Sequence, residues 1–303
     1  MKIEPTGAVM GAIGSEIDLS KPLGDADFGD IVAALGKHGV ICFPNQTLDA
    51  PALKQFSERF GTLQVSVSGQ YTHPAQPEVM ILSNMKENGQ PIGLADAGQD
   101  WHTDMSYMDV IGFVNVLHAE EVPFRDGKPL GATLFANMRQ AYLDLPEEMK
   151  TRLKDAICVH DFNKFWENMR ARPGSERPPL SPEARAKRPA VRHPLFLIHP
   201  ITGEEILYAN PGYAEYIEGM DRKESDEILE FLFKHQLQAK YQYQHDWAKG
   251  DVLIWDHIGT LHTAIADYTP EEHRKMIRCQ VYADKVFEPA FVADALKHAS
   301  AAA

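Results

Sequence analysis

Short apolar segments recur along the whole chain and define the class of fold that it can adopt. Apolar residues at helical spacing are found at about 28–35, 53–60, 138–154 and 223–237. Many short strands with few helices favour a sandwich or barrel over a doubly wound parallel sheet, so we predict a β-rich α+β fold with peripheral helices. The predicted strands lie at 40–43, 79–82, 113–118, 133–136, 205–208, 252–255 and 276–283.

The composition narrows the class of partner. At 303 residues the chain is long enough for one large domain or two smaller ones, and 44% of its residues are hydrophobic, as in an ordinary globular protein. A formal net charge of -13 argues against binding to nucleic acid or to a membrane surface, since both need a basic face. A small molecule is the expected partner, and a homo-oligomer is compatible with the sequence.

The cysteines and the N-terminal residues indicate the compartment. The three cysteines show no CxxC spacing, which speaks against a disulfide framework and against a thiolate zinc site. The first residues contain no apolar run of the kind found in a signal peptide, and no window approaches 18 consecutive apolar residues. We therefore expect a cytoplasmic location.

The stretch from 160 to 193 differs in composition from the rest of the chain. It carries eight lysines and arginines against four acidic residues, together with five prolines. This composition predicts a long, largely irregular loop, and loops of that length in compact domains are usually functional or disordered. A solvated surface insertion and a lid over a site are both compatible with the pattern.

A short triplet, His102-Thr103-Asp104, points to metal chemistry. Side chains two residues apart on a strand point to the same face, so His102 and Asp104 could offer a nitrogen and an oxygen to one ion. His262, 158 residues after Asp104, would supply a third ligand from a distant strand. Two histidines and one carboxylate are typical of non-haem Fe(II) oxygenases. Taken alone, a His-x-Asp triplet is more often a surface or capping group.

Two arginines near the end of the chain suggest an anion site. Arg274 and Arg278 are four residues apart on a predicted strand and therefore share a face, while Ile277 and Cys279 belong to the opposite, apolar face. An unpaired buried guanidinium costs several kcal/mol, so each arginine needs an anionic partner. That partner is either a structural carboxylate or a bound carboxylate or sulfonate.

Several motifs, in order, resemble the family of Fe(II)/2-oxoglutarate-dependent dioxygenases that contains taurine dioxygenase and 2,4-dichlorophenoxyacetate dioxygenase. The resemblance runs nearly end to end and implies a single dioxygenase domain over 1–303 with a double-stranded β-helix, or jelly-roll, core. The motifs are Gly-Ala-Ile-Gly-Ser-Glu-Ile-Asp-Leu-Ser at 11–20, Trp-His-Thr-Asp at 101–104, His-Pro-Ile-Thr-Gly at 199–203, Trp-Asp-x-x-x-x-x-His at 255–262, and Asp267-Tyr268 followed by Arg274 and Arg278.

The resemblance assigns roles to individual residues. It implies that iron is held by His102, Asp104 and His262. It further implies that Thr133 and Arg274 bind the distal carboxylate of 2-oxoglutarate. The residues expected to contact the substrate are Arg278, Tyr107 and His73.

Three positions depart from the family pattern. Ala132 stands where an aspartate is common before the threonine, His257 stands where an asparagine is common, and Gly98 aligns with a substrate-contacting asparagine of the taurine enzyme. These changes leave the implied iron and co-substrate residues intact. They make taurine itself a doubtful substrate.

The implied reaction couples oxidative decarboxylation of 2-oxoglutarate, which uses O2 and gives succinate and CO2, to hydroxylation of a small organic molecule. An anionic substrate, such as a carboxylate, sulfonate or sulfate, is expected, with cleavage of a carbon–heteroatom bond where the hydroxylated carbon bears one. The alternatives are hydroxylation of a neutral molecule or amino-acid derivative, and a metal-binding protein without turnover.

Overall fold

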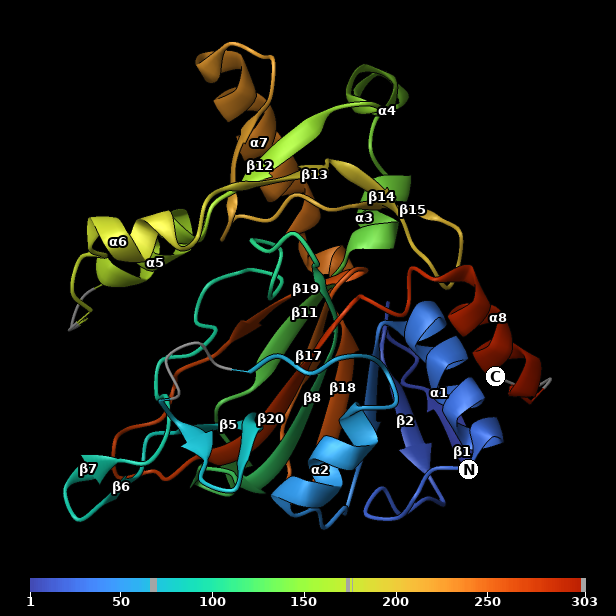
Figure 1. Cartoon of the computed structure of the whole chain (residues 1–303), viewed down its shortest axis with the longest axis vertical. Helices are drawn as coiled ribbons and strands as arrows, with labels where there is room; N and C mark the ends of the chain where they lie inside the picture. The colour runs from blue at the N-terminus through green and yellow to red at the C-terminus, as the bar shows by residue number, and fades with distance from the viewer. Residues whose placement is uncertain (66–69, 173–174, 176, 301–303) are drawn as a thin grey trace.

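A large antiparallel sheet forms the centre of the molecule, and its strands come from both halves of the chain (Figure 1). The computed structural model describes residues 1–65, 70–172, 175 and 177–300. Only β2 and β3 run parallel in this sheet, so the β-rich prediction is confirmed and a doubly wound sheet is excluded. The eight strands, in spatial order, are β1 (Lys2–Pro5), β2 (Ala12–Ser15), β3 (Val40–Phe43), β18 (Val252–Asp256), β8 (Gly112–Glu121), β20 (Lys275–Tyr282), β5 (Gln76–Ser83) and β4 (Thr72–His73).

The two faces of this sheet are covered by different elements. Alternation along β18 directs Val252 and Ile254 into a core with the helices, while Leu253 and Trp255 point to the opposite face. On that opposite face Trp255 packs against Phe135 of a second sheet. The helices are α1 (Asp25–His38), α2 (Ala50–Ser57) and α8 (Pro289–His298), and the second sheet contains β17 (Gln242–His245), β11 (Thr133–Asn137) and β19 (Thr260–Ala264).

A smaller layer of helices and strands with its own apolar core lies above the sheets in Figure 1. The sequence predicts one helix over about 138–154 here, but the chain forms two, because Pro146 stands between them and cannot continue a helix. The elements are α3 (Met138–Leu143), α4 (Glu147–Leu153), β12 (Ile157–His160), β13 (Val191–Pro194), β14 (Phe196–Ile198), β15 (Glu205–Leu207), β16 (Ala214–Ile217), α7 (Arg222–Gln236) and the 3-10 turn η1 (Ala239–Tyr241).

The segment 160–193 is more regular than its composition predicts. It contains α5 (Phe162–Arg170), which begins at Asp161 because that side chain accepts a hydrogen bond from the backbone N–H of Asn163, and the short helix α6 (Pro182–Ala186). Residues 173, 174 and 176 of this segment lie outside the described residues. The prediction of a largely irregular loop is therefore wrong for α5 and α6.

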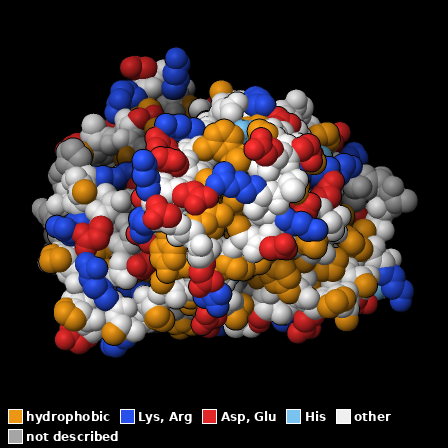
Figure 2. Space-filling view, turned by 90° about the horizontal axis from the view of Figure 1, so that it is seen from above, with side chains coloured by type: hydrophobic (Ala, Val, Ile, Leu, Met, Phe, Trp, Pro, Cys, Tyr) orange, Lys and Arg blue, Asp and Glu red, His pale blue; other side chains and the backbone are white. Residues whose placement is uncertain are grey.

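The remaining elements are two small hairpins, β6 (Lys86–Glu87) with β7 (Gln90–Pro91) and β9 (Phe124–Arg125) with β10 (Lys128–Pro129). None of the helices in the described part of the chain is long and apolar enough to span a bilayer. Figure 2 shows acidic and basic side chains interspersed over one face of the molecule, with hydrophobic side chains between them. Such mixing of charges is typical of a solvated surface.

Candidate metal centre and the adjoining cavity

His102 and His262 are held side by side by their own backbones. The N–H of His102 donates to the carbonyl of His262 at 3.0 Å, and the N–H of His262 donates to the carbonyl of His102 at 2.8 Å. His262 lies on β19, which is fixed in turn by its pairing with Phe135 of β11. The two imidazole centroids are 4.3 Å apart, so the spacing of the rings is set by main-chain hydrogen bonds.

Asp104 completes the group from a turn rather than from a strand. His102 occupies an isolated β-bridge, and the chain turns after it, with Met105 at a φ of 63°. The turn is anchored because the hydroxyl of Thr103 donates to the carbonyl of His257 at 2.5 Å. The Asp104 carboxylate then lies 3.3 Å from Nε2 of His102 and 3.6 Å from Nε2 of His262. The three predicted ligands therefore converge, although the strand geometry expected for the triplet is wrong.

The protonation states in this group suit a cation. Nδ1 of His102 is 2.6 Å from the carbonyl oxygen of Asp100 and donates to it, which turns Nε2 of the ring towards Asp104. Burial alone would raise the pKa of Asp104, but His102, Arg278 and His262 hold it well below its ordinary value. Burial lowers the pKa of His262 and keeps its ring neutral. A carboxylate and neutral imidazoles are the forms that bind metal ions.

One carboxylate oxygen of this group has no hydrogen-bond partner among the described residues. Oδ2 of Asp104 is buried and accepts no hydrogen bond from any described residue, and buried polar atoms are almost always satisfied. The donor atoms of His102, Asp104 and His262 all lie within 4.8 Å of one another. Two imidazoles and a carboxylate match the ligand set of a non-haem Fe(II) site.

Arg274 is buried close to the start of β11 without a carboxylate partner. It lies just before β20, so it precedes the strand on which the sequence places it. The residue is 8% exposed, and Tyr268 interacts with its side chain. Among the described residues its Nε has no hydrogen-bond partner, and no acidic oxygen lies within 4.0 Å of it. A Cβ at Gly131 would come within 3.1 Å of that Nε, so a glycine is needed there. Burial lowers the pKa of Arg274, and a bound anion would offset this cost.

Thr133 is the first residue of β11, two positions after Gly131. Its hydroxyl accepts a hydrogen bond from the indole N–H of Trp247 at 3.0 Å, which leaves the hydroxyl proton free to donate. Asp267 holds the preceding turn by accepting from the backbone N–H of Gly131 at 2.7 Å. Neighbouring segments thus present a hydroxyl and a guanidinium that has no carboxylate partner among the described residues, a donor set suited to a carboxylate.

A cavity of about 240 Å³ opens beside Asp104 and His102. Tyr107 and Arg278, both predicted to contact substrate, line it. Nη1 of Arg278 is also 3.6 Å from Oδ2 of Asp104. His73 is not one of the described residues that line the cavity. It lies on β4, and its Nδ1 accepts a hydrogen bond from the backbone N–H of Ala75. The structure therefore brings two of the three predicted substrate residues together.

A continuous series of rings forms one wall of the cavity. From the imidazole of His102 the centroid distances are 5.3 Å to Phe165, 4.9 Å from there to Tyr213, 4.8 Å to Tyr107 and 4.9 Å to Phe162. The guanidinium of Arg188 lies 4.4 Å over the ring of Phe162. The wall therefore leads from the candidate metal centre to a cation.

Sequence reasoning missed most of this wall. Phe162, Phe165 and Trp166 share the spacing of one helical face, and that spacing inside a basic, proline-rich stretch was the available signal. Arg177 and Arg188 also line the cavity, from the chain after α5. These residues become neighbours of the triplet only because α5 packs over it.

The three departures from the family pattern surround the same site. A Cβ at Gly98 would lie 3.4 Å from the His102 ring, and the φ of 72° favours glycine there. His257 is fully buried, and its Nε2 is 3.9 Å from Oδ2 of Asp104. Burial lowers the pKa of His257 to about 4, so the ring is neutral. Ala132 is buried beside Thr133 and adds no charge near Arg274.

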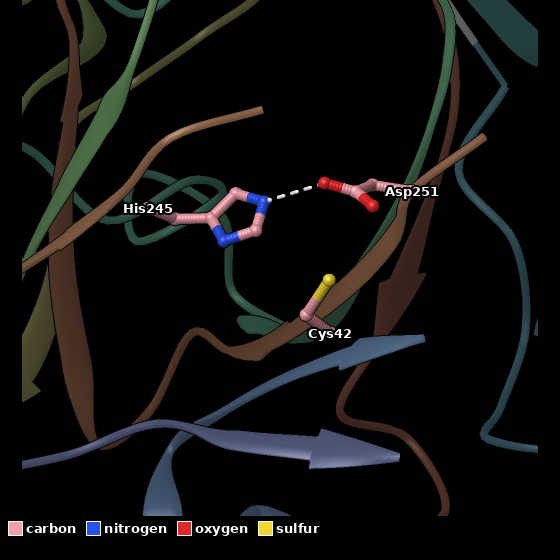
Figure 3. A group of neighbouring side chains, drawn as sticks. All are labelled: Cys42, His245 and Asp251. Carbon is pink, nitrogen blue, oxygen red and sulfur yellow. Dashed lines mark hydrogen bonds and ion pairs between the residues drawn. The ribbon is translucent and has the colours of Figure 1, made fainter. Parts of the chain in front are cut away.

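A second group of metal-capable side chains, Cys42, His245 and Asp251, lies elsewhere, and in it His245 and Asp251 already contact each other (Figure 3). Oδ2 of Asp251 is 3.2 Å from Nε2 of His245 and accepts from the backbone N–H of Ala248 at 2.8 Å. Burial, with the nearby Asp251 carboxylate, raises the pKa of the Cys42 thiol and disfavours the thiolate that a metal would need. The group is best described as a hydrogen-bonded polar network.

Comparison with known proteins gives one consistent group of relatives. The sequence profile of the family described as "Taurine catabolism dioxygenase TauD, TfdA family" matches residues 2–280. A pentalenolactone F synthase of Streptomyces avermitilis is 31% identical over 292 residues, which covers 93% of this chain and 94% of the relative. A (S)-phenoxypropionate/alpha-ketoglutarate-dioxygenase of Delftia acidovorans is 31% identical over 279 residues, covering 87% and 89%.

Solved structures give the same picture. The crystal structure of AAD-2 in complex with Mn(II) and N-oxalylglycine superimposes with a TM-score of 0.78 at 25% identity, covering 93% of this chain and 98% of that one. A taurine dioxygenase from Burkholderia xenovorans gives a TM-score of 0.74 at 25% identity, covering 93% and 91%. The similarity thus extends over nearly the full length of each protein.

Proposed function

The chain belongs to the TauD/TfdA family of taurine catabolism dioxygenases, and from this premise we propose that it hydroxylates a small organic anion with an apolar, ring-containing body. It is an alpha-ketoglutarate (2-oxoglutarate)-dependent dioxygenase that uses an iron ion, 2-oxoglutarate and O2. The observation that carries the substrate class is the cavity beside Asp104, which combines aromatic walls with arginines.

His102, Asp104 and His262 are the proposed iron ligands. Their fit is supported by the Oδ2 of Asp104, which accepts no hydrogen bond from the described residues, and by the oriented ring of His102. Bound iron would supply the activation of O2 that is coupled to decarboxylation of 2-oxoglutarate. The protein's part is to keep the carboxylate charged, the imidazoles neutral and the neighbouring positions open.

Arg274 and Thr133 are the proposed anchors of the distal carboxylate of 2-oxoglutarate. The guanidinium offers a bidentate fork, and the hydroxyl offers one more donor while its oxygen is held by Trp247. Charge at the anchor would be balanced only when the co-substrate is bound. The positive charge of Arg274 therefore supports a site that selects a dicarboxylate.

The substrate would occupy the cavity against Tyr107 and near Arg278. Two relatives are named for phenoxypropionate and 2,4-dichlorophenoxyacetate, molecules in which an aromatic ring and a carboxylate are joined through an ether oxygen. Hydroxylation of a carbon that bears oxygen, nitrogen or sulfur would give a product that collapses to a carbonyl compound and releases the heteroatom group. Taurine has no ring to match the aromatic wall.

A neutral substrate is the second candidate, and one contact favours it. Nη1 of Arg278 lies 3.6 Å from Oδ2 of Asp104, so part of its charge is used within the protein. In that case Arg278 would support the iron ligand rather than bind an anion.

The segment 160–193 would act as a lid of this single domain, with the two sheets beneath as halves of a jelly roll. Two ion pairs support the lid: Arg172 is 2.7 Å from the carboxylate of Asp100, and Arg177 is 2.8 Å from that of Asp96. Both acids lie just before His102. Shortening the segment should slow substrate-dependent turnover, and unchanged turnover would count against a lid.

The function is tested by succinate formation from 2-oxoglutarate with Fe(II), with and without candidate substrates. We expect slow uncoupled turnover alone, and faster O2 uptake with aryloxyalkanoates than with their neutral amides. His102→Ala serves as the inactive control. An enzyme stimulated equally by acids and amides would support the neutral candidate, and absence of succinate under every condition would contradict the assignment.

A further inference from the structure

Three arginines line the cavity in the described part of the chain, and they differ in how their charge is used. Arg177 donates to both oxygens of Asp96, at 2.8 and 2.9 Å, and is therefore neutralised. Arg278 lies 3.6 Å from Asp104 and is partly neutralised by it. Arg188 has no acidic oxygen within 4.0 Å among the described residues. The free positive charge of the cavity is therefore on Arg188.

We propose that Arg188 is the receptor for the anionic group of the substrate. This inference rests on the proposed function and deepens it, because it names the residue that selects an anion. Arg188 is half-buried, and its guanidinium carbon lies 4.4 Å from the centroid of the Phe162 ring, a contact that positions the guanidinium without using its hydrogen-bond donors. Carboxylates and sulfonates are the groups that such a planar donor fork binds best.

The aromatic wall relates Arg188 to the reacting centre. The rings of Phe162, Tyr107, Tyr213 and Phe165 connect it, contact by contact, to the imidazole of His102. A substrate anion held at Arg188 would place an apolar or aromatic body along these rings. The carbon to be oxidised would then lie at the other end, near His102 and Asp104.

The charge balance around the cavity supports the same assignment. Three arginines face two neighbouring carboxylates, those of Asp96 and Asp104, in a chain whose formal net charge is -13. A local excess of positive charge in an acidic protein needs a reason, and cavities concentrate the field of such a group. Both Arg188 and Arg278 lower the pKa of the Tyr107 phenol against the larger effect of burial, so both act on the same space.

The competing explanation is structural: Arg188 would only pack on Phe162 and hold α5. The two explanations differ in one measurable property, the preference for an acid over its neutral amide. Arg188→Gln and Arg188→Lys test this, and Arg185→Gln is the matched control, since Arg185 lies in the same segment, pairs with Glu167 and does not line the cavity.

The probes are phenoxyacetate and phenoxyacetamide, titrated by calorimetry into protein loaded with Mn(II) and N-oxalylglycine. We expect the wild type to prefer the acid, and Arg188→Gln to weaken acid binding roughly 10- to 100-fold, as loss of a charge-assisted hydrogen bond implies. Amide binding should stay within about twofold. Arg188→Lys should retain part of the preference, and Arg185→Gln all of it.

The proposal would be overturned if Arg188→Gln binds the acid as tightly as the wild type, or if the variant weakens binding of acid and amide equally. It would also be overturned if the wild type shows no preference for the acid or does not bind it. If Arg188→Gln does not fold, Arg188→Lys still tests the proposal, because it should lower the preference for the acid partway and leave amide binding unchanged. Failure of the proposed function is seen separately, as absence of succinate formation from Fe(II) and 2-oxoglutarate in the wild type under every condition, with and without candidate substrates.

Discussion

His102, Asp104 and His262 form one group of three metal-capable side chains in the described residues, and Cys42, His245 and Asp251 form another. Both groups are largely buried, and both contain a histidine and an aspartate. In the first, Oδ2 of Asp104 has no hydrogen-bond partner, whereas in the second Oδ2 of Asp251 accepts from two groups. Unsatisfied atoms that converge, rather than residue type, distinguish a candidate ion site from a structural network.

The largest expected effect is on the first group. Asp104→Ala, like His102→Ala, should abolish succinate formation. Loss of a group that only hydrogen-bonds to a metal ligand lowers metal affinity roughly 10- to 100-fold, and loss of a ligand itself should lower it further. The metal content after dialysis against Mn(II), with His245→Ala as the control, measures this. Retained stoichiometry in the Asp104 variant would remove the distinction between the groups.

The second effect concerns the proposed co-substrate anchor, where the Arg274 guanidinium has no carboxylate partner among the described residues. Arg274→Gln should raise the KM for 2-oxoglutarate roughly 10- to 100-fold, because a charge-assisted hydrogen bond to the distal carboxylate is lost. Arg139→Gln, which breaks a surface pair with Glu204, is the control. An unchanged KM would mean that Arg274 is satisfied in some other way.

The third effect is on stability alone. Asp251→Ala removes the acceptor of His245 and of the Ala248 N–H, and should lower the free energy of unfolding in urea by about 1–3 kcal/mol. The metal stoichiometry of the folded protein should stay the same. A drop in bound metal would instead show that Cys42, His245 and Asp251 hold an ion.

The smallest effect tests whether an unsatisfied nitrogen is enough to define a site. Among the described residues, both ring nitrogens of His160 lack hydrogen-bond partners, and no carboxylate approaches them. Burial lowers the pKa of His160 from 6.5 to about 3. The unfolded chain binds a proton that the folded one does not, so stability is full above pH 6.5 and falls as the pH drops towards 3. His160→Phe should flatten the melting temperature of the metal-free protein between pH 7 and 5. An unaltered slope would assign the pH dependence to other groups.

The candidate metal ligands could be predicted because they belong to short sequence motifs. His102 and Asp104 are two residues apart, and His262 follows Trp255 and Asp256 at a family-like spacing. The strand geometry expected for the triplet was wrong, since the turn at Asp104 depends on Thr103 reaching the backbone of His257, a contact between distant segments. Local sequence does not encode such a contact.

The substrate side was less accessible to sequence reasoning. The composition of 160–193 indicated a special segment, but Arg188 becomes significant only because Arg177 has Asp96 as a partner and Arg188 has none among the described residues. Those pairings exist only in the folded molecule. A candidate metal site built from short motifs can therefore be predicted from the sequence, whereas substrate specificity that depends on packing between distant segments cannot.

The paired backbone hydrogen bonds of His102 and His262 have a consequence for biosynthesis. They join residues 160 positions apart, and contacts of such separation form late because a long loop must first close. When the ribosome has made residues 1–261, the third candidate donor, His262, is still absent. A growing chain therefore has an incomplete set of donors until His262 has been added, so a product stalled before that residue would lack the complete candidate ion site.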